Sequence, residues 1–382
     1  MYRVPVLSVI GQPLMPTKPS RARRWIKEGK AVKKWSKLGV FLVELVQPPS
    51  DTKTQPIAVG IDPGKKYSGI GVVSAKQTLL TAHLELPFPK VKERMEQRRL
   101  MRRRRRGRRI NRKLPFNQRA HRQSRKDNRR GHKLPPSVRA NRQLELRVVA
   151  EVCKLFPISN VFYEYVEARG SQSFSPVMVG QKFMLQWLEK YAPVTTKFGW
   201  QTANMREKLG LFKQKHAKKD PIPATHAIDG VALAAYGFLD YKPFHFSNAH
   251  GHEWRGDVVI TEAPFIIVKR PPISRRHLHL MLPSQGGKRR KYGGTTTRHG
   301  VRKGDFVRAE KAGRIYYGWV SGDTEKQISV SAHNWKRLGQ FTARKVELLQ
   351  RSTGLICQPL YGGAAFLPSL GREEGVSCRE IR

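Results

Sequence analysis

The sequence predicts an α/β protein, and three observations support this class. Apolar runs at residues 57–62, 67–74 and 78–86 have the length and composition of three consecutive strands. Between residues 137 and 239, stretches with helical spacing alternate with strand-like stretches. Beyond Tyr241 the pattern changes to short β-type runs separated by turns. The 382 residues are enough for two or three domains, and a hydrophobic content of 39% permits real cores.

Residues 1–50 are predicted to form a small basic module. Residues 4–10 and 39–46 are strand-like, and they flank a helical stretch at 19–30 in which Pro19 and Ser20 suit a helix start. A Pro-rich linker at 47–51 then ends the module, and residues 51–89 hold the three predicted core strands.

Residues 90–133 differ sharply in composition and are predicted to be a basic insertion. Five consecutive arginines occupy 102–106, and further basic residues follow at nearly every turn, so the segment cannot be core. As a helix, residues 92–113 would be cationic on every side, with Met95, Leu100 and Ile110 as apolar anchors. The alternative is a disordered basic arm. Residues 119–133 have few apolar side chains and are expected to order only on RNA.

Residues 134–241 return to the core pattern. Leu144, Val148, Val149 and Val152 repeat as one apolar face of a helix at 137–155. A strand at 160–166, a helix at 181–191, a strand at 195–201 and an alanine-rich helix at 224–239 follow. The succession from residue 57 is therefore β-β-β-α-β-α-β-α. Residues 242–382 are predicted to form a β-rich domain, with the last twenty or so residues loosely ordered.

The charge balance predicts a polyanionic partner. Lys and Arg number 74 against 28 Asp and Glu, which gives a formal net charge of +46. Repulsion on this scale favours a nucleic-acid partner. No apolar run is long enough to span a bilayer, and the N-terminus lacks a small-residue cleavage site, so we expect a cytoplasmic protein that does not enter membranes. Three widely separated cysteines argue against a disulfide framework or a zinc site.

Three acids from distant parts of the sequence are candidate metal ligands. Asp62 ends the first core strand, Glu164 lies in an otherwise apolar strand where a charge is costly, and Asp229 lies on the alanine-rich helix. His226 is three residues before Asp229, so the two share one helix face, and Ala232 is small enough to let that helix approach the sheet. Each acid alone could be a solvated strand or helix end.

A nuclease that uses two Mg²⁺ ions needs several carboxylates on rigid elements, with the ions about 3.5–4 Å apart. An RNase H-like fold would place acids on these same elements. Glu167 is the main rival to Glu164, but strand alternation puts it on a different face. We therefore predict that Asp62, Glu164 and Asp229 bind two Mg²⁺ ions, with Mn²⁺ as a substitute, and that His226 orients or deprotonates the attacking water.

Several motifs resemble those of a known family. The stretches that resemble the first, second and third RuvC motifs are 58–64 with 68–71, 161–164, and 226–229. The arginine-rich segment is similar to the bridge helix of the transposon-encoded IscB and IsrB proteins. Pro13-Leu14-Met15-Pro16 resembles the motif that names their N-terminal PLMP domain. The resemblance runs from about residue 4 to at least residue 348.

The resemblance implies a RuvC-type core of RNase H-like fold, guided by a long structured RNA, the ωRNA, to double-stranded DNA beside a short adjacent motif. IscB carries an HNH nuclease between its second and third RuvC motifs, whereas residues 170–221 contain a single histidine, His216, and no such pattern. This matches the IsrB family and implies a nickase of the non-target strand. We expect one protein chain in the ribonucleoprotein.

The basic side chains divide into two predicted surfaces. The N-terminal helix and the arginine-rich helix are assigned to RNA, with a solvated face as the alternative for the former. The RNA-binding set is Arg21, Arg23, Arg24, Lys27, Arg98, Arg99, Arg102, Arg103, Arg104, Arg105, Arg106, Arg108, Arg109 and Arg112. The C-terminal domain resembles the one that reads the adjacent motif, and its DNA-binding set is Lys288, Arg289, Arg290, Lys291, Arg298, Arg302 and Lys303.

Two other functions stay open at this point. A guide-independent junction or transposon nuclease fits the carboxylates but leaves the PLMP-like module and the arginine-rich insertion unexplained. A non-cleaving RNA-guided DNA-binding protein predicts the loss of at least one metal ligand, and none is lost here. TnpB, another guided nuclease, is disfavoured because it typically carries a four-cysteine zinc motif.

Overall fold

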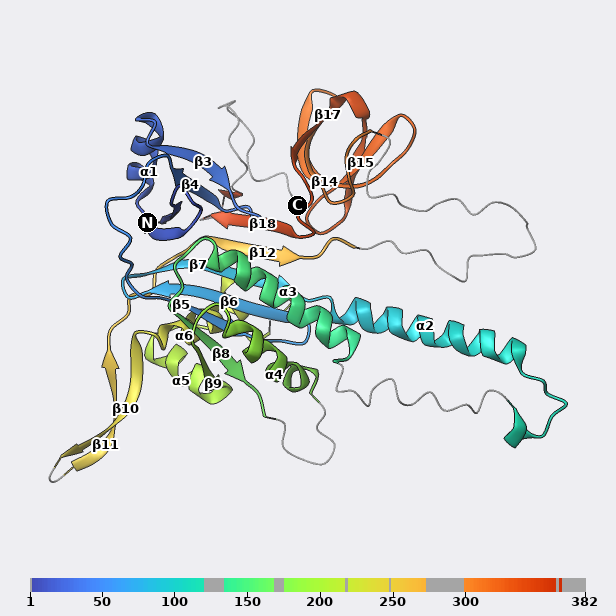
Figure 1. Cartoon of the computed structure of the whole chain (residues 1–382), viewed down its shortest axis with the longest axis horizontal. Coiled ribbons are helices and arrows are strands. Elements are labelled where there is room, and N and C mark those ends of the chain that lie inside the picture. The colour runs from blue at the N-terminus through green and yellow to red at the C-terminus, as the bar shows by residue number, and fades with distance from the viewer. Residues whose placement is uncertain are drawn as a thin grey trace. The chain divides into compact units, whose positions relative to one another are not determined.

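The computed structural model describes residues 2–119, 134–167, 175–216, 219–246, 249–272, 299–361 and 364–365 (Figure 1). The chain divides into two compact units, each described by itself. The first comprises Met1–Leu86, Arg142–Arg270 and Leu355–Arg382, and the second comprises Pro87–Asn141 and Pro271–Gly354. No helix in the described ranges is both long and apolar enough to cross a membrane.

The centre of the first unit is a mixed sheet in which the predicted core strands are adjacent. β5 (Ile57–Asp62), β6 (Tyr67–Ser74) and β7 (Gln77–Glu85) form an antiparallel meander. β8 (Asn160–Tyr165) pairs in parallel with β5, and β9 (Val194–Phe198) pairs in parallel with β8. The strand order β7-β6-β5-β8-β9 therefore brings the ends of β5 and β8 side by side.

Three more strands extend this sheet beyond β7. β12 (Phe265–Lys269) is parallel to β7, β18 (Ile356–Tyr361) is antiparallel to β12, and β19 (Ala364–Ala365) pairs with β18. These strands come from the C-terminal part of the sequence. Their pairing shows that segments after residue 242 complete the central sheet.

Helices cover both faces of the sheet. They are α3 (Pro136–Cys153), α4 (Pro176–Leu188), α5 (Gly199–Lys208) and α6 (Ile228–Ala235), and a π-helical turn, η4 (Pro223–Ala227), leads directly into α6. The predicted succession of strands and helices is thus present, with α5 as an additional helix between β9 and α6. The prediction of a strand over 195–201 was partly wrong, because its last residues begin α5.

Alternation along β5 separates two cores. Ile57, Val59 and Ile61 pack in the cluster that contains the apolar face of α3, whereas Ala58 packs with α6. The polar residue Asp62 follows the same alternation and lies on the α6 face.

Three glycines set the distance between α6 and the sheet. A Cβ on Gly60 would lie 2.1 Å from the carbonyl oxygen of Gly230, and a Cβ on Gly71 would lie 2.3 Å from the backbone nitrogen of Val231. A Cβ on Gly230 would lie 2.5 Å from the nitrogen of Gly71. Backbone contacts this close need glycine on both sides. The sequence predicted this approach from Ala232, and the role of Gly230 was not predicted.

The N-terminal module is a four-stranded sheet with one helix. β1 (Val4–Leu7), β2 (Pro13–Thr17), β3 (Ala31–Trp35) and β4 (Phe41–Leu45) take the order β2-β1-β4-β3, and α1 (Pro19–Lys27) packs on them. The start of α1 agrees with its predicted start. β2 and β3 were not predicted, because β2 contains two prolines and β3 buries only its first residue.

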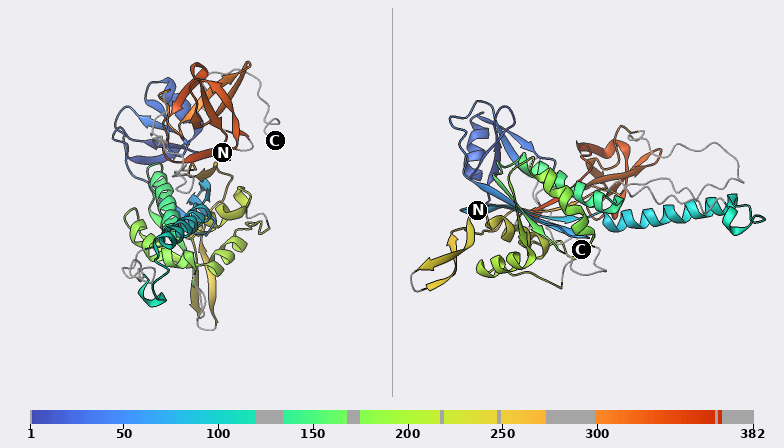
Figure 2. Two further views of the ribbon diagram at one scale, coloured as in Figure 1. Left: turned by 90° about the vertical axis from the view of Figure 1, so that its right-hand side faces the viewer. Right: turned by 60° about the horizontal axis from the view of Figure 1, so that its bottom comes forward.

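A two-stranded hairpin completes the first unit. β10 (Leu239–Phe246) and β11 (Ala249–Gly256) pair along their whole lengths and project from the unit in every view (Figures 1 and 2).

The second unit contains the arginine-rich helix. α2 (Phe88–Arg109) begins and ends four residues earlier than the predicted helix, and η1 (Phe116–Gln118) follows it. Leu100 is 56% exposed, so its predicted role as an apolar anchor is wrong.

The second unit also contains a five-stranded antiparallel sheet of order β16-β15-β14-β13-β17. Its strands are β13 (Phe306–Lys311), β14 (Arg314–Asp323), β15 (Gln327–Ser331), β16 (Arg337–Thr342) and β17 (Val346–Gln350), with η7 (Ala343–Lys345) before the last. The predicted loose tail lies outside the described residues, apart from the short strand β19 just before it.

Candidate active site

Two predicted metal ligands lie next to each other at the carboxyl ends of parallel strands. Ile61 of β5 is paired with Tyr163 of β8, and Asp62 and Glu164 are the next residues on their strands. Both acids lie on the sheet face covered by α6, because they alternate with Ile61 and Tyr163, which pack on the opposite face. Asp62 is only 8% exposed.

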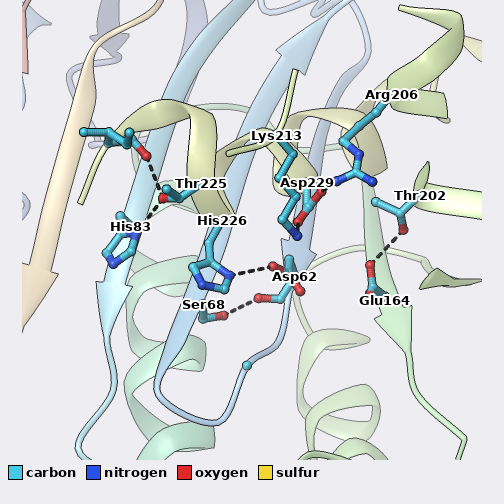
Figure 3. Close-up of polar contacts among 12 residues, drawn as sticks. Asp62, Ser68, His83, Glu164, Thr202, Arg206, Lys213, Thr225, His226 and Asp229 are labelled. Atoms are coloured by element: carbon cyan, nitrogen blue, oxygen red, sulfur yellow. Dashed lines mark hydrogen bonds and ion pairs between the residues drawn. The ribbon is translucent and has the colours of Figure 1, made fainter. Parts of the chain in front are cut away.

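The third predicted ligand, Asp229 (Figure 3), lies in the first turn of α6. It is 2% exposed. Nη1 of Arg206 donates to its Oδ1 atom at 2.6 Å, and the ammonium of Lys213 donates to Oδ2. Burial raises the pKa of Asp229, and the negative charge of Asp62 raises it further, although Lys213 and Arg206 oppose the change. Neither basic partner was predicted from the sequence.

His226 contacts the first acid directly. It lies in the π-helical turn η4, and its Nδ1 atom is 3.1 Å from Oδ2 of Asp62. Its ring centroid lies 5.7 Å from that of Tyr67 and 5.7 Å from that of His83. Its Nε2 atom is buried and has no hydrogen-bond partner among the described residues. Nδ1 is therefore the nitrogen that faces the carboxylate of Asp62.

A second histidine, missed by the sequence analysis, lies behind His226. His83 on β7 is fully buried, and its Nδ1 atom is 3.4 Å from the hydroxyl oxygen of Thr225. Burial lowers the pKa of His83 to about 4, and His226 contributes to the same shift. The imidazole is thus neutral near pH 7 and packs as an uncharged ring against His226. A lone histidine in an apolar strand was the available signal.

Glu164 is held by a helix that the sequence did not predict. Thr202 on α5 donates a hydrogen bond of 2.9 Å to its Oε2 atom. Burial raises the pKa of Glu164 to about 7, and the charges of Asp62 and Asp229 add to the increase. Glu164 is therefore close enough to both aspartates for their negative charges to raise its pKa.

This donor set fits a hard divalent cation in its chemistry and charge. Carboxylate oxygens are the ligands that Mg²⁺ prefers, and a cation would relieve the repulsion from Asp62 and Asp229 that adds to the effect of burial on the pKa of Glu164. No group of three His, Cys, Asp or Glu side chains within the described ranges is arranged so that it could hold a metal ion. The acids are neighbours without forming a coordination sphere, and their role as ligands stays a prediction.

The basic residues predicted to bind RNA are largely solvent-facing where they are described. Arg21, Arg23, Arg24 and Lys27 are exposed on α1. Exposed side chains also include Arg98, Arg99, Arg102, Arg103, Arg104 and Arg112. Nothing is described for the side chains of Arg105, Arg106, Arg108 and Arg109. Exposure leaves the first two groups accessible to phosphates and does not test the assignment.

The predicted DNA-binding residues lie mostly outside the described part of the chain. This holds for Lys288, Arg289, Arg290, Lys291 and Arg298. Arg302 is exposed, whereas the ammonium of Lys303 lies 5.5 Å from the centroid of the Trp335 ring. Burial lowers the pKa of Lys303, and the charge of Arg94 lowers it further.

The fold and the site define a mixed α/β protein with a cluster of buried acids at one end of its central sheet. A family model described as "RRXRR protein" matches residues 4–177. The pattern spelled by this name occurs at residues 105–109.

Two solved structures of RuvC from Thermus thermophilus resemble the chain weakly. The complex with a Holliday junction substrate is 17% identical, covers 47% of this chain and 90% of its own, and has a TM-score of 0.27. The second RuvC structure is 16% identical with the same coverage and a TM-score of 0.26. No curated protein matches the sequence.

Proposed function

We propose that this chain is a divalent-metal-dependent nuclease with an RNase H-like, RuvC-type core. The observation that carries the proposal is the convergence of Asp62, Glu164 and Asp229, with His226 in contact with the first. The acids lie at the ends of the first and fourth core strands and on the last core helix, which are the positions that an RNase H-like core would use.

In this proposal each side chain has a distinct task. Asp62, Glu164 and Asp229 would hold two Mg²⁺ ions, or Mn²⁺ in their place, and the bound metal supplies an activated water and charge stabilisation for the leaving oxygen. His226 holds Asp62 through the hydrogen bond that its Nδ1–H donates to the carboxylate, and it would orient or deprotonate the attacking water only once Nδ1 has given up that bond and its proton. Thr202 fixes the rotamer of Glu164.

We further propose that the substrate is double-stranded DNA with an adjacent motif, found by means of a long structured guide RNA. The net charge of +46 and the exposed basic residues of α1 and α2 support a nucleic-acid partner. The PLMP-like and bridge-like motifs support the ωRNA as that partner. The match to residues 4–177 covers both motifs and the first and second RuvC-like motifs.

The interval between the second and third RuvC-like motifs supports a single active centre. It contains α4, β9 and α5, and its sequence has only one histidine, His216. One centre implies that one strand, the non-target strand, is cut.

The test uses the ribonucleoprotein purified with its RNA, supercoiled plasmid carrying a guide match, and Mg²⁺. We expect open-circle product that Asp62→Ala abolishes. Linear product would contradict a single-centre nickase, and tight binding without any product would favour a non-cleaving DNA-binding protein. Purification without a long RNA, together with cleavage of branched DNA, would favour the guide-independent nuclease.

A further inference from the structure

A buried charged pair lies on α3, on the face of the sheet opposite α6. Arg142 is 1% exposed and Glu145 is 0% exposed, and Nη1 of Arg142 is 2.9 Å from Oε2 of Glu145. Apolar side chains of similar volume often stabilise a core as well as such a pair does. The contacts of the guanidinium therefore indicate why a charged side chain is present at this buried position.

The guanidinium joins the ends of the two strands that carry predicted metal ligands. Its Nη2 atom donates to the carbonyl oxygen of Gly64 at 2.9 Å, and Nη1 donates to the hydroxyl oxygen of Tyr163 at 3.0 Å. Gly64 belongs to the turn that follows Asp62, and Tyr163 immediately precedes Glu164. The planar fork of arginine suits this task because it donates in two fixed directions.

The turn after β5 is held at a second point. The buried hydroxyl of Ser68 donates to the carbonyl oxygen of Asp62 at 2.6 Å. A Cβ on Gly64 would lie 1.6 Å from the carbonyl oxygen of Tyr67, so the turn folds back tightly. The carbonyls of Asp62 and Gly64, on either side of Pro63, thus each have a buried donor.

We propose that Arg142, kept in place by Glu145, is a positioning residue that fixes the Asp62 turn relative to Glu164. The claim that this placement serves the reaction rests on the proposed nuclease function. Arg142 acts from behind the sheet and does not face the substrate side.

Hydrogen exchange in the full chain tests the contact without any need for activity. In Arg142→Met we expect the amides of residues 62–68 to exchange at least about tenfold faster, while the centre of β6 is unchanged. Arg142→Lys keeps the charge but loses the fork, so it should be intermediate, and it carries the test if the methionine variant does not fold. Arg139→Met, an exposed arginine one turn earlier on α3, is the control and should match the wild type.

Calorimetric titration with Mn²⁺ and plasmid nicking test the link to the reaction. We expect the half-saturating Mn²⁺ concentration to rise several-fold in Arg142→Met, to rise less in Arg142→Lys, and to stay unchanged in Arg139→Met. Unchanged exchange in both Arg142 variants would overturn the proposal. If the Arg142 variants exchange faster but bind Mn²⁺ and nick DNA like the wild type, Arg142 holds the turn without positioning it for the reaction. If the wild-type chain neither binds Mn²⁺ nor nicks DNA, the nuclease proposal fails, and the exchange result still decides whether Arg142 holds the turn.

Discussion

The carboxylate of Asp229 is bound by two basic side chains, and one of them acts on a second acid as well. Lys213 donates to Asp229, and its charge also opposes the rise in the pKa of Glu164 that burial and the two aspartates cause. The ammonium therefore lies where it interacts with two predicted metal ligands. A buried carboxylate without a cationic partner is costly, so Lys213 and a divalent cation would stabilise the same acids.

Replacing Lys213 tests whether this lysine and a divalent cation stabilise the same acids. In Lys213→Met with chelator present, we expect a loss of about 1–3 kcal/mol in the free energy of unfolding, because Asp229 keeps only Arg206 as a partner. Added Mn²⁺ should raise the melting temperature of the variant more than that of the wild type. Lys215→Met changes an exposed lysine two residues away and serves as the control. If Mn²⁺ raises the melting temperatures of Lys213→Met and Lys215→Met equally, Lys213 and the cation do not stabilise the same acids.

Glu164 makes the stability depend on pH in a predictable direction. Its pKa of about 7 in the folded protein is above the ordinary carboxyl value of 4.5, so the folded state binds more protons between these values. The contribution of Glu164 to stability is therefore present below about pH 4.5 and is lost as the pH rises through about 7. His83, with its lowered pKa, has the opposite dependence at acidic pH.

The variant Glu164→Gln isolates this contribution, because His83 is the same in both proteins. From about pH 5 to about pH 8, its stability relative to the wild type should increase by about 1–3 kcal/mol, since the glutamine has no proton to lose. Urea unfolding with chelator at the two pH values measures the difference. A relative stability that does not change with pH would show that Glu164 ionises as an ordinary carboxyl.

At the scale of elements, the sequence predicted best where burial alone determines the structure. The bounds of β5 and β6 were predicted correctly, because both strands are almost wholly buried and end at turns. α5 was missed because only Thr202 and Met205 of its residues are buried, which leaves no helical apolar stripe. Its contribution to the site, the Thr202 hydroxyl, could not be predicted because it depends on a contact 38 residues away in sequence.

The contact between α6 and the sheet gives a prediction at this scale. Gly71→Ala should destabilise the protein by about 3 kcal/mol or more, because the new Cβ would meet the backbone of α6 rather than a side chain that can move. Gly322→Ala is the matched control, since a Cβ there meets no atom within 4 Å and the backbone is not left-handed. Thermal unfolding of both variants measures the effect. Similar melting temperatures would mean that α6 can shift away from the sheet without loss.

At the scale of the whole molecule, the excess of basic residues raises the question of which of them contact nucleic acid. α1 carries exposed Arg21, Arg23, Arg24 and Lys27, and among the described residues only Arg24 of these four approaches an acid, Glu28, at 3.8 Å. An ion pair that exposed contributes little and is screened by salt. These four side chains are thus available to phosphates. If they were merely solvated, they would contribute only to the overall electrostatic field of the protein.

Salt dependence separates these two possibilities. If the four side chains contact phosphates, changing all of them to Gln should weaken RNA binding and reduce the slope of log affinity against log salt by about 3, at about 0.7–0.9 per contact. The control changes four exposed basic residues with no assigned partner in nucleic acid, Lys311, Arg314, Lys326 and Arg337, to Gln, so that the net charge falls equally. Binding of one short structured RNA is measured over a range of KCl concentrations. If the slope of log affinity against log salt falls by the same amount in both quadruple variants, α1 contributes only to the general electrostatic field of the protein. If the slope falls only in the α1 variant, α1 contacts the RNA directly.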